Sequence, residues 1–202
     1  MSLATAPIVL ASASAARRAM LEAAGLTVIA EPARVDEEEV KASFREAGMK
    51  AEAVAEALAE LKAGRVGPRH PGLLTIGADQ MLECDGRWFD KPADRAAARA
   101  QLQALRGRTH RLVSCAVVAR GGVRMWHHID AARLTMRNVS DGFLDAYLDA
   151  AGEAVLSSVG AYHLEGLGAQ LFNRVEGDYF TVLGLPLLPV LDFLRIQGVL
   201  PS

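Results

Sequence analysis

The sequence of 202 residues predicts an α/β fold built on a mixed sheet, and three observations support this prediction. Short apolar runs that are typical of buried strands alternate with segments that have capping residues and helical periodicity. Residues 110–120 and 123–137 are separated by two glycines and predict a pair of long antiparallel strands. Hydrophobic residues make up 51% of the chain and charged residues 23%, as in ordinary globular proteins. We therefore expect one domain over residues 1–202, because the sequence marks no internal boundary.

Capping residues and glycines define the elements expected in the first half of the chain. Ser12 and Ser14 are N-cap candidates for the first helix, and Gly25 is placed to end it. Gly48 interrupts a long helical stretch and is expected to divide it into two helices. The expected elements are strands over residues 7–11, 26–30 and 73–78, a helix over residues 15–24, and helical structure from the acidic run at 36–39 to about residue 63.

The second half of the chain carries similar signals. The Asp85-Gly86 pair predicts a hairpin turn, while Asp94 and Ser140 are N-cap candidates for two further helices. Pro186 suits the first turn of a last helix. The expected elements are a hairpin within residues 81–89, helices over residues 94–107 and 140–152, the two long strands, a short strand over residues 170–175, and the final helix.

Charge, cysteine content and hydropathy exclude several classes of protein. The formal net charge of −2 argues against a general nucleic-acid binder, which would have a strong basic bias. Cys84 and Cys115 are too few for a disulfide framework and fit a reducing compartment. No apolar stretch reaches membrane-spanning length, and an apolar patch followed by arginines reverses the order of a secretory signal. We therefore expect a cytoplasmic protein without nucleic-acid or membrane partners.

Asp79 and Lys91 are the most informative polar positions. An apolar run over residues 73–76 stops at Gly77, which is expected to let the backbone turn, and Asp79 follows directly. An acid just past the end of a strand lies where α/β proteins place their chemistry. A carboxylate near a lysine suits a metal-assisted phosphate reaction. The competing interpretation is that Asp79 caps a turn and that Lys91 is solvated.

Other clusters of polar or small residues can complete such a site, and each has an ordinary alternative. Ser12 and Arg17 lie where the first helix begins, so they can bind a phosphate together with free backbone N–H groups, or merely cap the helix. The acidic run at 36–39 can bind a divalent cation with Asp79, although most acidic runs are solvated surface. The glycines between residues 160 and 186 indicate backbone that lies close to something, or a tight packing corner.

Taken in order, these motifs resemble those of the Maf family of nucleoside triphosphate pyrophosphatases over nearly the whole chain. Each motif is weak alone, whereas the ordered set is specific. The matching stretches are LASASAARRAML, VDEEE, ALAELKA, TIGADQ, FDKP, LRGRTHRLVS, VGAYHLEGLGAQLF and EGDYFTVLGLPLL. The resemblance implies an elongated, two-lobed α/β fold with a central cleft, similar to the ITPase-like fold. Members of the family often form dimers, so a homodimer is an expected assembly.

The resemblance also implies a reaction and the residues that perform it. The reaction is hydrolysis of the α–β phosphate bond of a nucleoside triphosphate to a monophosphate and pyrophosphate, with a divalent cation, Mg²⁺ or Mn²⁺. Asp79 corresponds to the essential acid, usually given as the proton acceptor. By motif position the resemblance assigns catalysis to Asp79 and Lys91, metal binding to Glu37 and Asp79, and substrate binding to Ser12, Arg17, Lys62 and Glu165.

Three departures from the common family pattern bear on the choice of base. Ala15 stands where proline is common, and Ala16 displaces the paired arginines by one position. Gln80 replaces the usual threonine and Glu165 the usual glutamine. The common pattern goes with thymidine and uridine triphosphates, whereas these variants look more like the branch linked to 7-methylguanosine triphosphate. A carboxylate can accept donors from a guanine edge, but the base stays open.

Two other functions compete with the pyrophosphatase. Proteins of this resemblance have been connected with arrest of septum formation, so a regulator of cell division that binds a nucleotide without turnover is one alternative. A general phosphatase, which would release orthophosphate, is the other. Both alternatives must explain why acids and cations occupy every expected motif position.

Overall fold

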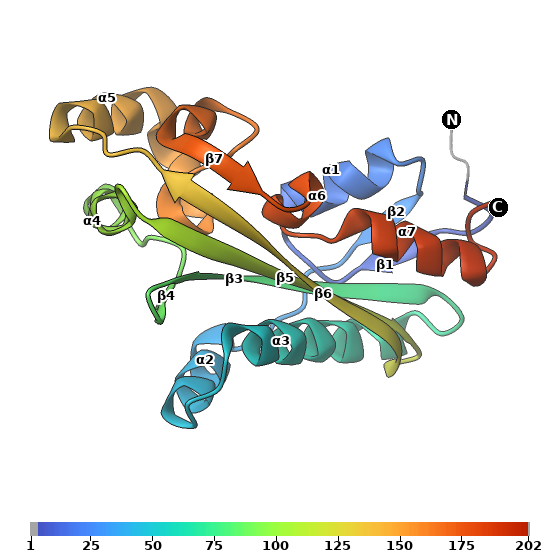
Figure 1. The fold of residues 1–202 in the computed structure, drawn as a ribbon. Coiled ribbons are helices and arrows are strands. Elements are labelled where there is room, and N and C mark those ends of the chain that lie inside the picture. Colours follow the sequence, from blue (N-terminus) through green and yellow to red (C-terminus); the bar gives the residue numbers. More distant parts are fainter. Residues whose placement is uncertain (1–3, 202) are drawn as a thin grey trace.

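A mixed sheet of seven strands runs the length of the protein, of which a computed structural model describes residues 4–201 (Figure 1). The strands are β1 (Ile8–Leu10), β2 (Val28–Ala30), β3 (Leu74–Cys84), β4 (Arg87–Phe89), β5 (Thr109–Arg120), β6 (Val123–Met136) and β7 (Phe172–Glu176). Their order is β2-β1-β3-β5-β6-β7, with β4 beside β3. β1 pairs in parallel with β2 and β3, and the remaining pairs are antiparallel. The α/β fold with a mixed sheet is therefore confirmed.

Helices cover both faces of this sheet (Figure 1). They are α1 (Ala15–Ala23), α2 (Glu37–Glu46), α3 (Ala51–Val66), α4 (Arg95–Leu105), α5 (Asp141–Ala151), α6 (Tyr179–Val182) and α7 (Leu187–Ile196), with short 3₁₀ helices η1 (Gly67–Arg69), η2 (Gly152–Ser157), η3 (Val159–Ala161) and η4 (Leu167–Leu171). α3 packs on β3 and β5 on one face, while α1, α6 and α7 lie on the other. α4 and α5 pack together at one end of the molecule.

The predicted helix limits are confirmed because the capping residues act as expected. Ser14, Asp94 and Ser140 each accept a hydrogen bond from a backbone N–H in the first turn of α1, α4 and α5. Gly48 separates α2 from α3 with a φ of 64°, a conformation that disfavours residues with a Cβ atom. Local signals were therefore sufficient to place most elements.

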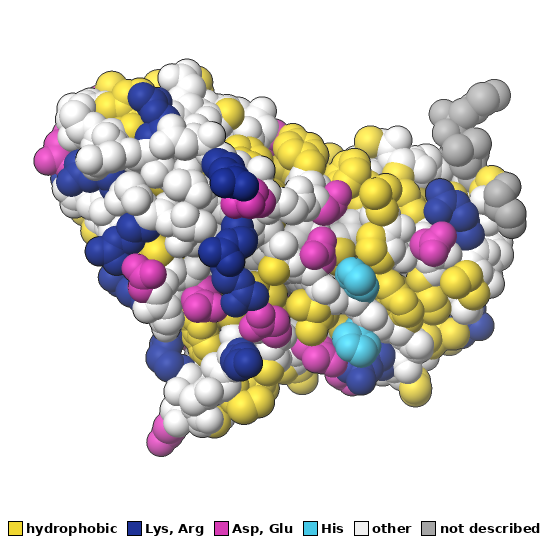
Figure 2. All heavy atoms as spheres, in the orientation of Figure 1, with side chains coloured by type: hydrophobic (Ala, Val, Ile, Leu, Met, Phe, Trp, Pro, Cys, Tyr) yellow, Lys and Arg dark blue, Asp and Glu magenta, His cyan; other side chains and the backbone are white. Residues whose placement is uncertain are grey.

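The apolar core is divided along the sheet, which gives the molecule its two lobes. One cluster, which includes Leu102 and Leu144, packs α4 and α5 against one end of the long strands. A second cluster, which includes Leu21 and Leu194, packs α1 and α7 against β1 and the other end of β3. Figure 2 shows basic and acidic side chains intermixed over the first end and hydrophobic side chains gathered around α7. The long strands join the two lobes, so a residue in mid-strand lies between them.

Asp79 lies in the middle of a strand, and this corrects the sequence prediction. Residues 73–78 were expected to end in a turn at Gly77, but β3 continues from Leu74 to Cys84. Gly77 is needed for close packing instead, since a Cβ atom there would lie 2.1 Å from the carbonyl oxygen of Ala59 in α3. The acid therefore faces a helix rather than a loop.

The sheet is interrupted beside Asp79. β1 pairs with β3 only as far as Ile76, and β4 pairs with the same edge of β3 from Leu82 onward. Among the described residues, no strand pairs with this edge between those two positions, while β5 continues along the other edge. The gap between β1 and β4 opens the interior of the sheet to the loops around it.

Candidate active site

One cavity of about 1010 Å³ lies over the gap in the sheet. It is bounded by the loop from β1 to α1, the start of α2, α3, the middle of β3, the loop before α4 and the segment 157–165. All seven residues that the sequence assigned to the site line it: Ser12, Arg17, Glu37, Lys62, Asp79, Lys91 and Glu165. The structure thus brings together residues that are spread over most of the chain.

Lys62 lies at the centre of the charged cluster. Its Nζ atom is 2.6 Å from Oδ1 of Asp79 and 2.6 Å from Oε1 of Glu37. Lys62 and Asp79 are buried, whereas the Glu37 side chain is 43% exposed. α3 presents Lys62 to the face of β3 that carries Asp79, because alternate residues of a strand share a face. One buried ammonium therefore orients two carboxylates.

Asp79 retains one oxygen without a partner. Its Oδ2 atom is buried, and no hydrogen-bond donor reaches it among the described residues. A buried carboxylate oxygen of this kind is costly to leave unpaired, so it is a natural position for a ligand. Within residues 4–201, no group of three or more His, Cys, Asp or Glu side chains could hold a metal ion unaided. A cation at this position would need further oxygen ligands from water or substrate.

Glu37 stays ionised at neutral pH. Burial acts to raise the pKa of Glu37, but the charge and hydrogen bond of Lys62 outweigh burial and lower it. Lys41 and Lys91 lie close enough to lower the pKa of Glu37 further. The carboxylate is therefore surrounded by cations on several sides.

Arg17 uses most of its donors on the protein itself. Its Nε atom donates to the carbonyl oxygen of Gly184 at 2.7 Å, and Nη1 donates to Ala78 at 3.0 Å and to Oγ of Ser12 at 3.1 Å. Ala78 lies on the interrupted edge of β3, so the guanidinium satisfies a carbonyl that a strand would otherwise bind. Burial lowers the pKa of Arg17, and the charges of Asp79 and Glu37 oppose that shift. An arginine keeps its charge in proteins, so Arg17 adds positive potential beside Asp79.

The first turn of α1 opens onto the cavity. Ser14 caps the helix by accepting a hydrogen bond from the backbone N–H of Arg17, and Oγ of Ser12 accepts one from the N–H of Ser14. Backbone N–H groups at a helix N-terminus attract anions. Residues 12–17 all line the cavity, so the predicted phosphate cradle has the required position.

Lys91 and Lys41 supply cations on the opposite wall. Lys91 is exposed, and no ion pair or hydrogen bond involves its side chain among the described residues. Lys41 forms an ion pair of 2.6 Å with Asp90, the residue before Lys91. Lys41 was not predicted from the sequence, although it follows Glu37 by one helical turn and therefore shares its face of α2.

Gln80 and Glu165 occupy different parts of the cavity. The Nε2 atom of Gln80 lies 3.0 Å from Oγ of Ser114 and 3.0 Å from the carbonyl oxygens of Thr181 and Val182. Gln80 therefore ties β3 to α6, while its Oε1 atom has no partner among the described residues. Glu165 lies on the segment 157–165, with its carboxylate 3.5 Å from Nδ1 of His163. Only Glu165 of the two is an exposed acceptor.

The glycines between residues 160 and 186 serve packing more than ligand contact. A Cβ atom at Gly160 would lie 2.6 Å from Leu82, and one at Gly177 would lie 2.9 Å from the Cα atom of Ala132. Gly184 is the exception, because it lines the cavity and packs against the guanidinium of Arg17. The packing-corner interpretation therefore accounts for most of this series.

The fold and the site define an α/β protein with paired carboxylates, cations and a helix N-terminus around one cleft. A sequence profile described as Maf-like protein matches residues 7–197, so the chain belongs to the Maf family. The family assigned from the motifs is thus confirmed. No helix formed by the described residues has both the length and the apolar character needed to cross a membrane.

Relatives with curated names cover almost the whole chain. A protein of Paramagnetospirillum magneticum named nucleoside triphosphate pyrophosphatase is 64% identical over 95% of this chain and 98% of its own length. A protein of Mesorhizobium japonicum named 7-methyl-GTP pyrophosphatase is 50% identical over 97% and 98% of the two chains. A crystal structure titled nucleoside-triphosphatase / dITP/XTP pyrophosphatase from Mycobacterium abscessus is 19% identical, covers 66% of this chain and 74% of that chain, and has a TM-score of 0.39.

Proposed function

We propose that the protein hydrolyses the α–β phosphate bond of a nucleoside triphosphate and releases a nucleoside monophosphate and pyrophosphate. The names of the relatives support this reaction, and the family match over residues 7–197 includes every segment that lines the cavity. The observation that carries the proposal is the buried ammonium of Lys62 between the carboxylates of Asp79 and Glu37, with Oδ2 of Asp79 left free.

The chemistry needs positive charge on both sides of the bond that breaks. Water adds to phosphorus while the bond to the bridging oxygen breaks, the proton of water moves to a carboxylate oxygen, and pyrophosphate leaves. Lys62 fixes Oδ1 of Asp79, so Oδ2 is the atom that accepts the proton or binds a cation. Lys91, Arg17 and the N-terminus of α1 would stabilise the charge that develops on the leaving group.

The donor set suits a hard divalent cation, Mg²⁺ or Mn²⁺. Asp79 offers an unpaired oxygen, and Glu37 is ionised and bound to the same ammonium. Magnesium sites in phosphate enzymes commonly use one or two carboxylates and complete the shell with phosphate oxygens and water. When bound, the cation would neutralise the polyphosphate and polarise its oxygens.

The candidate bases of the triphosphate substrate include modified purines as well as pyrimidines. Glu165 is an exposed carboxylate on the cavity wall and can accept the N–H donors of a guanine edge. The free Oε1 atom of Gln80 is a second acceptor in the same cavity. One relative is named for 7-methyl-GTP, so 7-methylguanosine triphosphate belongs in the first set of substrates.

A panel of nucleoside triphosphates, normal and 7-methylated, tests the proposal. The purified protein is incubated with each compound and Mg²⁺ or Mn²⁺, and the products are separated by chromatography. We expect equal amounts of nucleoside monophosphate and pyrophosphate from at least one compound. Orthophosphate in place of pyrophosphate would indicate a general phosphatase. Tight binding without any product would instead favour the regulator of cell division.

A further inference from the structure

Gln101 of α4 connects two walls of the cavity that no other described side chain joins in this way. Its Nε2 atom donates to the carbonyl oxygen of Asp90 at 2.8 Å. Its Oε1 atom accepts the backbone N–H of Gly160 at 3.2 Å. Asp90 precedes Lys91, and Gly160 lies within the segment 157–165, so one amide group links the loop that carries Lys91 to this segment.

The orientation of the Gln101 amide follows from its partners. The carbonyl of Asp90 can only accept, and the N–H of Gly160 can only donate. Turning the amide over would place two acceptors together at Asp90 and two donors together at Gly160. Glutamine supplies this donor and this acceptor at neutral pH, whereas an ionised glutamate of the same length supplies acceptors only.

Gly160 lies at a backbone corner that needs support. Its φ is 78°, and the next residue, Ala161, has a φ of 60°, which is uncommon for a residue with a Cβ atom. The hydroxyl of Tyr147 donates to the carbonyl oxygen of Ala161 at 3.1 Å. The corner is thus held at its N–H by Gln101 and at its carbonyl by Tyr147. Residues 157–159 and 162–165, on either side of the corner, all line the cavity.

The Asp90 end of the connection is held equally well. The carboxylate of Asp90 forms an ion pair with Lys41 of α2, while its carbonyl accepts from Gln101 of α4. Lys91 follows immediately and has no partner of its own among the described residues. Its backbone position therefore depends on the contacts of Asp90.

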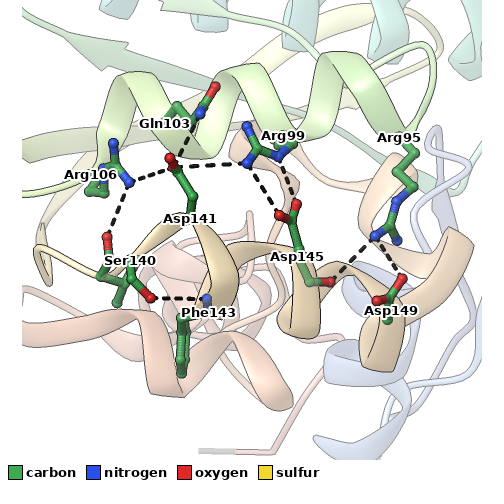
Figure 3. Close-up of polar contacts among 10 residues, drawn as sticks. Arg95, Arg99, Gln103, Arg106, Ser140, Asp141, Phe143, Asp145 and Asp149 are labelled. Carbon is green, nitrogen blue, oxygen red and sulfur yellow. Dashed lines mark hydrogen bonds and ion pairs between the residues drawn. The ribbon is translucent and has the colours of Figure 1, made fainter.

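α4 itself is fixed on its opposite face. Figure 3 shows Arg95 and Arg99 of α4, and Arg106 at its C-cap, beside the acids of α5. Arg99 pairs with Asp145 at 2.7 Å, and the other two arginines pair with acids one helical turn away on either side. Residue 101 lies about 200° around the helix from residue 99, so it points away from this ladder. Gln101 therefore extends from a helix that α5 holds in place.

We propose that Gln101 is a positioning residue that fixes the cationic wall at Lys91 relative to the segment 157–165. This inference rests on the proposed function, in which Lys91 acts on the polyphosphate and the opposite segment contacts the nucleoside. A triphosphate must engage both walls at once for its reactive bond to be placed correctly. Loss of the connection would therefore lower kcat/KM most for the triphosphates that depend most on contacts between their nucleoside and the segment 157–165.

The test compares Gln101→Met with Gln103→Met. Methionine keeps the volume and helix propensity of glutamine but removes both hydrogen bonds. Gln103 lies on the same helix, is exposed, and among the described residues donates only to Asp141 of the α5 ladder, at 3.3 Å (Figure 3). A second variant, Gln101→Glu, keeps an acceptor for Gly160 but removes the donor to Asp90.

Kinetics on the triphosphate panel and thermal unfolding are measured for all of these proteins. We expect Gln101→Met to lower kcat/KM for the best triphosphate by roughly tenfold, mainly through KM, and to reduce its preference over the poorest one. Gln101→Glu should show the same direction, while Gln103→Met should match the wild type. Gln101→Met should unfold only about 2–4 °C below Gln103→Met, because it loses one more hydrogen bond with a net contribution of about 1 kcal/mol.

Three outcomes would overturn the inference. Gln101→Met could match Gln103→Met in kinetics, it could slow every triphosphate equally, or it could lose stability in step with activity. The proposed function fails separately, when the wild type releases no pyrophosphate from any triphosphate. In that event calorimetric binding of the same triphosphates replaces kinetics, and equal affinity of the two methionine variants rejects the role of Gln101.

Discussion

Replacing Lys62 by methionine is the strongest perturbation of the charged cluster. The Lys62 side chain is 8% exposed and its ammonium lies 2.6 Å from both Asp79 and Glu37. Methionine fills much of the same space, so little of the effect comes from a cavity. The substitution therefore isolates the loss of the charge that the two carboxylates share.

The two ion pairs contribute unequally to the expected loss of stability. Removing one partner of a buried pair costs about 3–5 kcal/mol, and this figure applies to Asp79, whose side chain is 6% exposed. The pair with Glu37 is discounted to about 0–1 kcal/mol because that side chain is 43% exposed. For a chain of this size, about 3–5 kcal/mol corresponds to a fall of roughly 6–20 °C in Tm.

Thermal unfolding followed by circular dichroism measures this fall, and pyrophosphate release measures the loss of activity. Arg65→Met is the matched control, because it removes an exposed cation from the same helix. We expect Lys62→Met to lose both stability and nearly all turnover, while the control keeps both. An unfolding temperature for Lys62→Met within about 1 °C of the control would refute the reasoning, because the buried ammonium would then contribute no stability.

Three further predictions concern single side chains. Asp79→Asn should lower turnover by at least about 100-fold in a protein that still folds, because the side chain loses the negative charge at Oδ2. Asp85→Asn, in the exposed turn after β3, is the control. Normal turnover of Asp79→Asn would reject the role of Asp79. Lys91→Ala should lower kcat/KM strongly without changing Tm, since the side chain is exposed. The control Lys50→Ala should keep the kcat/KM of the wild type. An unchanged kcat/KM in Lys91→Ala would place Lys91 outside the site. Burial lowers the pKa of His110 to about 4, so the unfolded state binds the extra proton below its own pKa of about 6.5. As the pH is lowered from 6.5 to 4, the free energy of unfolding should therefore fall by up to about 1.4 kcal/mol per pH unit. Urea unfolding measures this fall, which should be smaller in His110→Gln. An equal fall in the variant would show that another group is responsible.

Local signals in the sequence predicted most of the elements, and the seven site residues predicted from motifs all line the cavity, whereas Lys41 was not predicted. Capping serines and aspartates mark helix starts because they satisfy free N–H groups of the first turn, whatever the tertiary structure. The site residues were found through ordered motifs of a resembling family, and the single domain over residues 1–202 stays a prediction. The error at Gly77 arose because a glycine required by a neighbouring helix looks the same in sequence as one required by a turn.

Contacts between distant segments could not be predicted in the same way. Lys41 meets Asp90 across 49 positions, and Gln101 meets Gly160 across 59. Neither pair has a spacing that signals contact, because both depend on how α2 and α4 pack around the loop at Lys91. A lysine or a glutamine on the polar face of a helix has no local feature that distinguishes a cavity wall from solvent.

The interruption of the sheet explains why the chemistry is concentrated at Asp79. Two short strands, β1 and β4, share one edge of β3 and leave the carbonyl of Ala78 for Arg17 to bind. Alternation along the strand then directs Asp79 toward Lys62 of α3 and Gln80 toward α6 on the other face. A strand that paired fully along this edge would satisfy the same backbone groups but would close the gap over which the cavity lies. The incomplete pairing of β3 is therefore what allows a buried carboxylate to meet a ligand from outside.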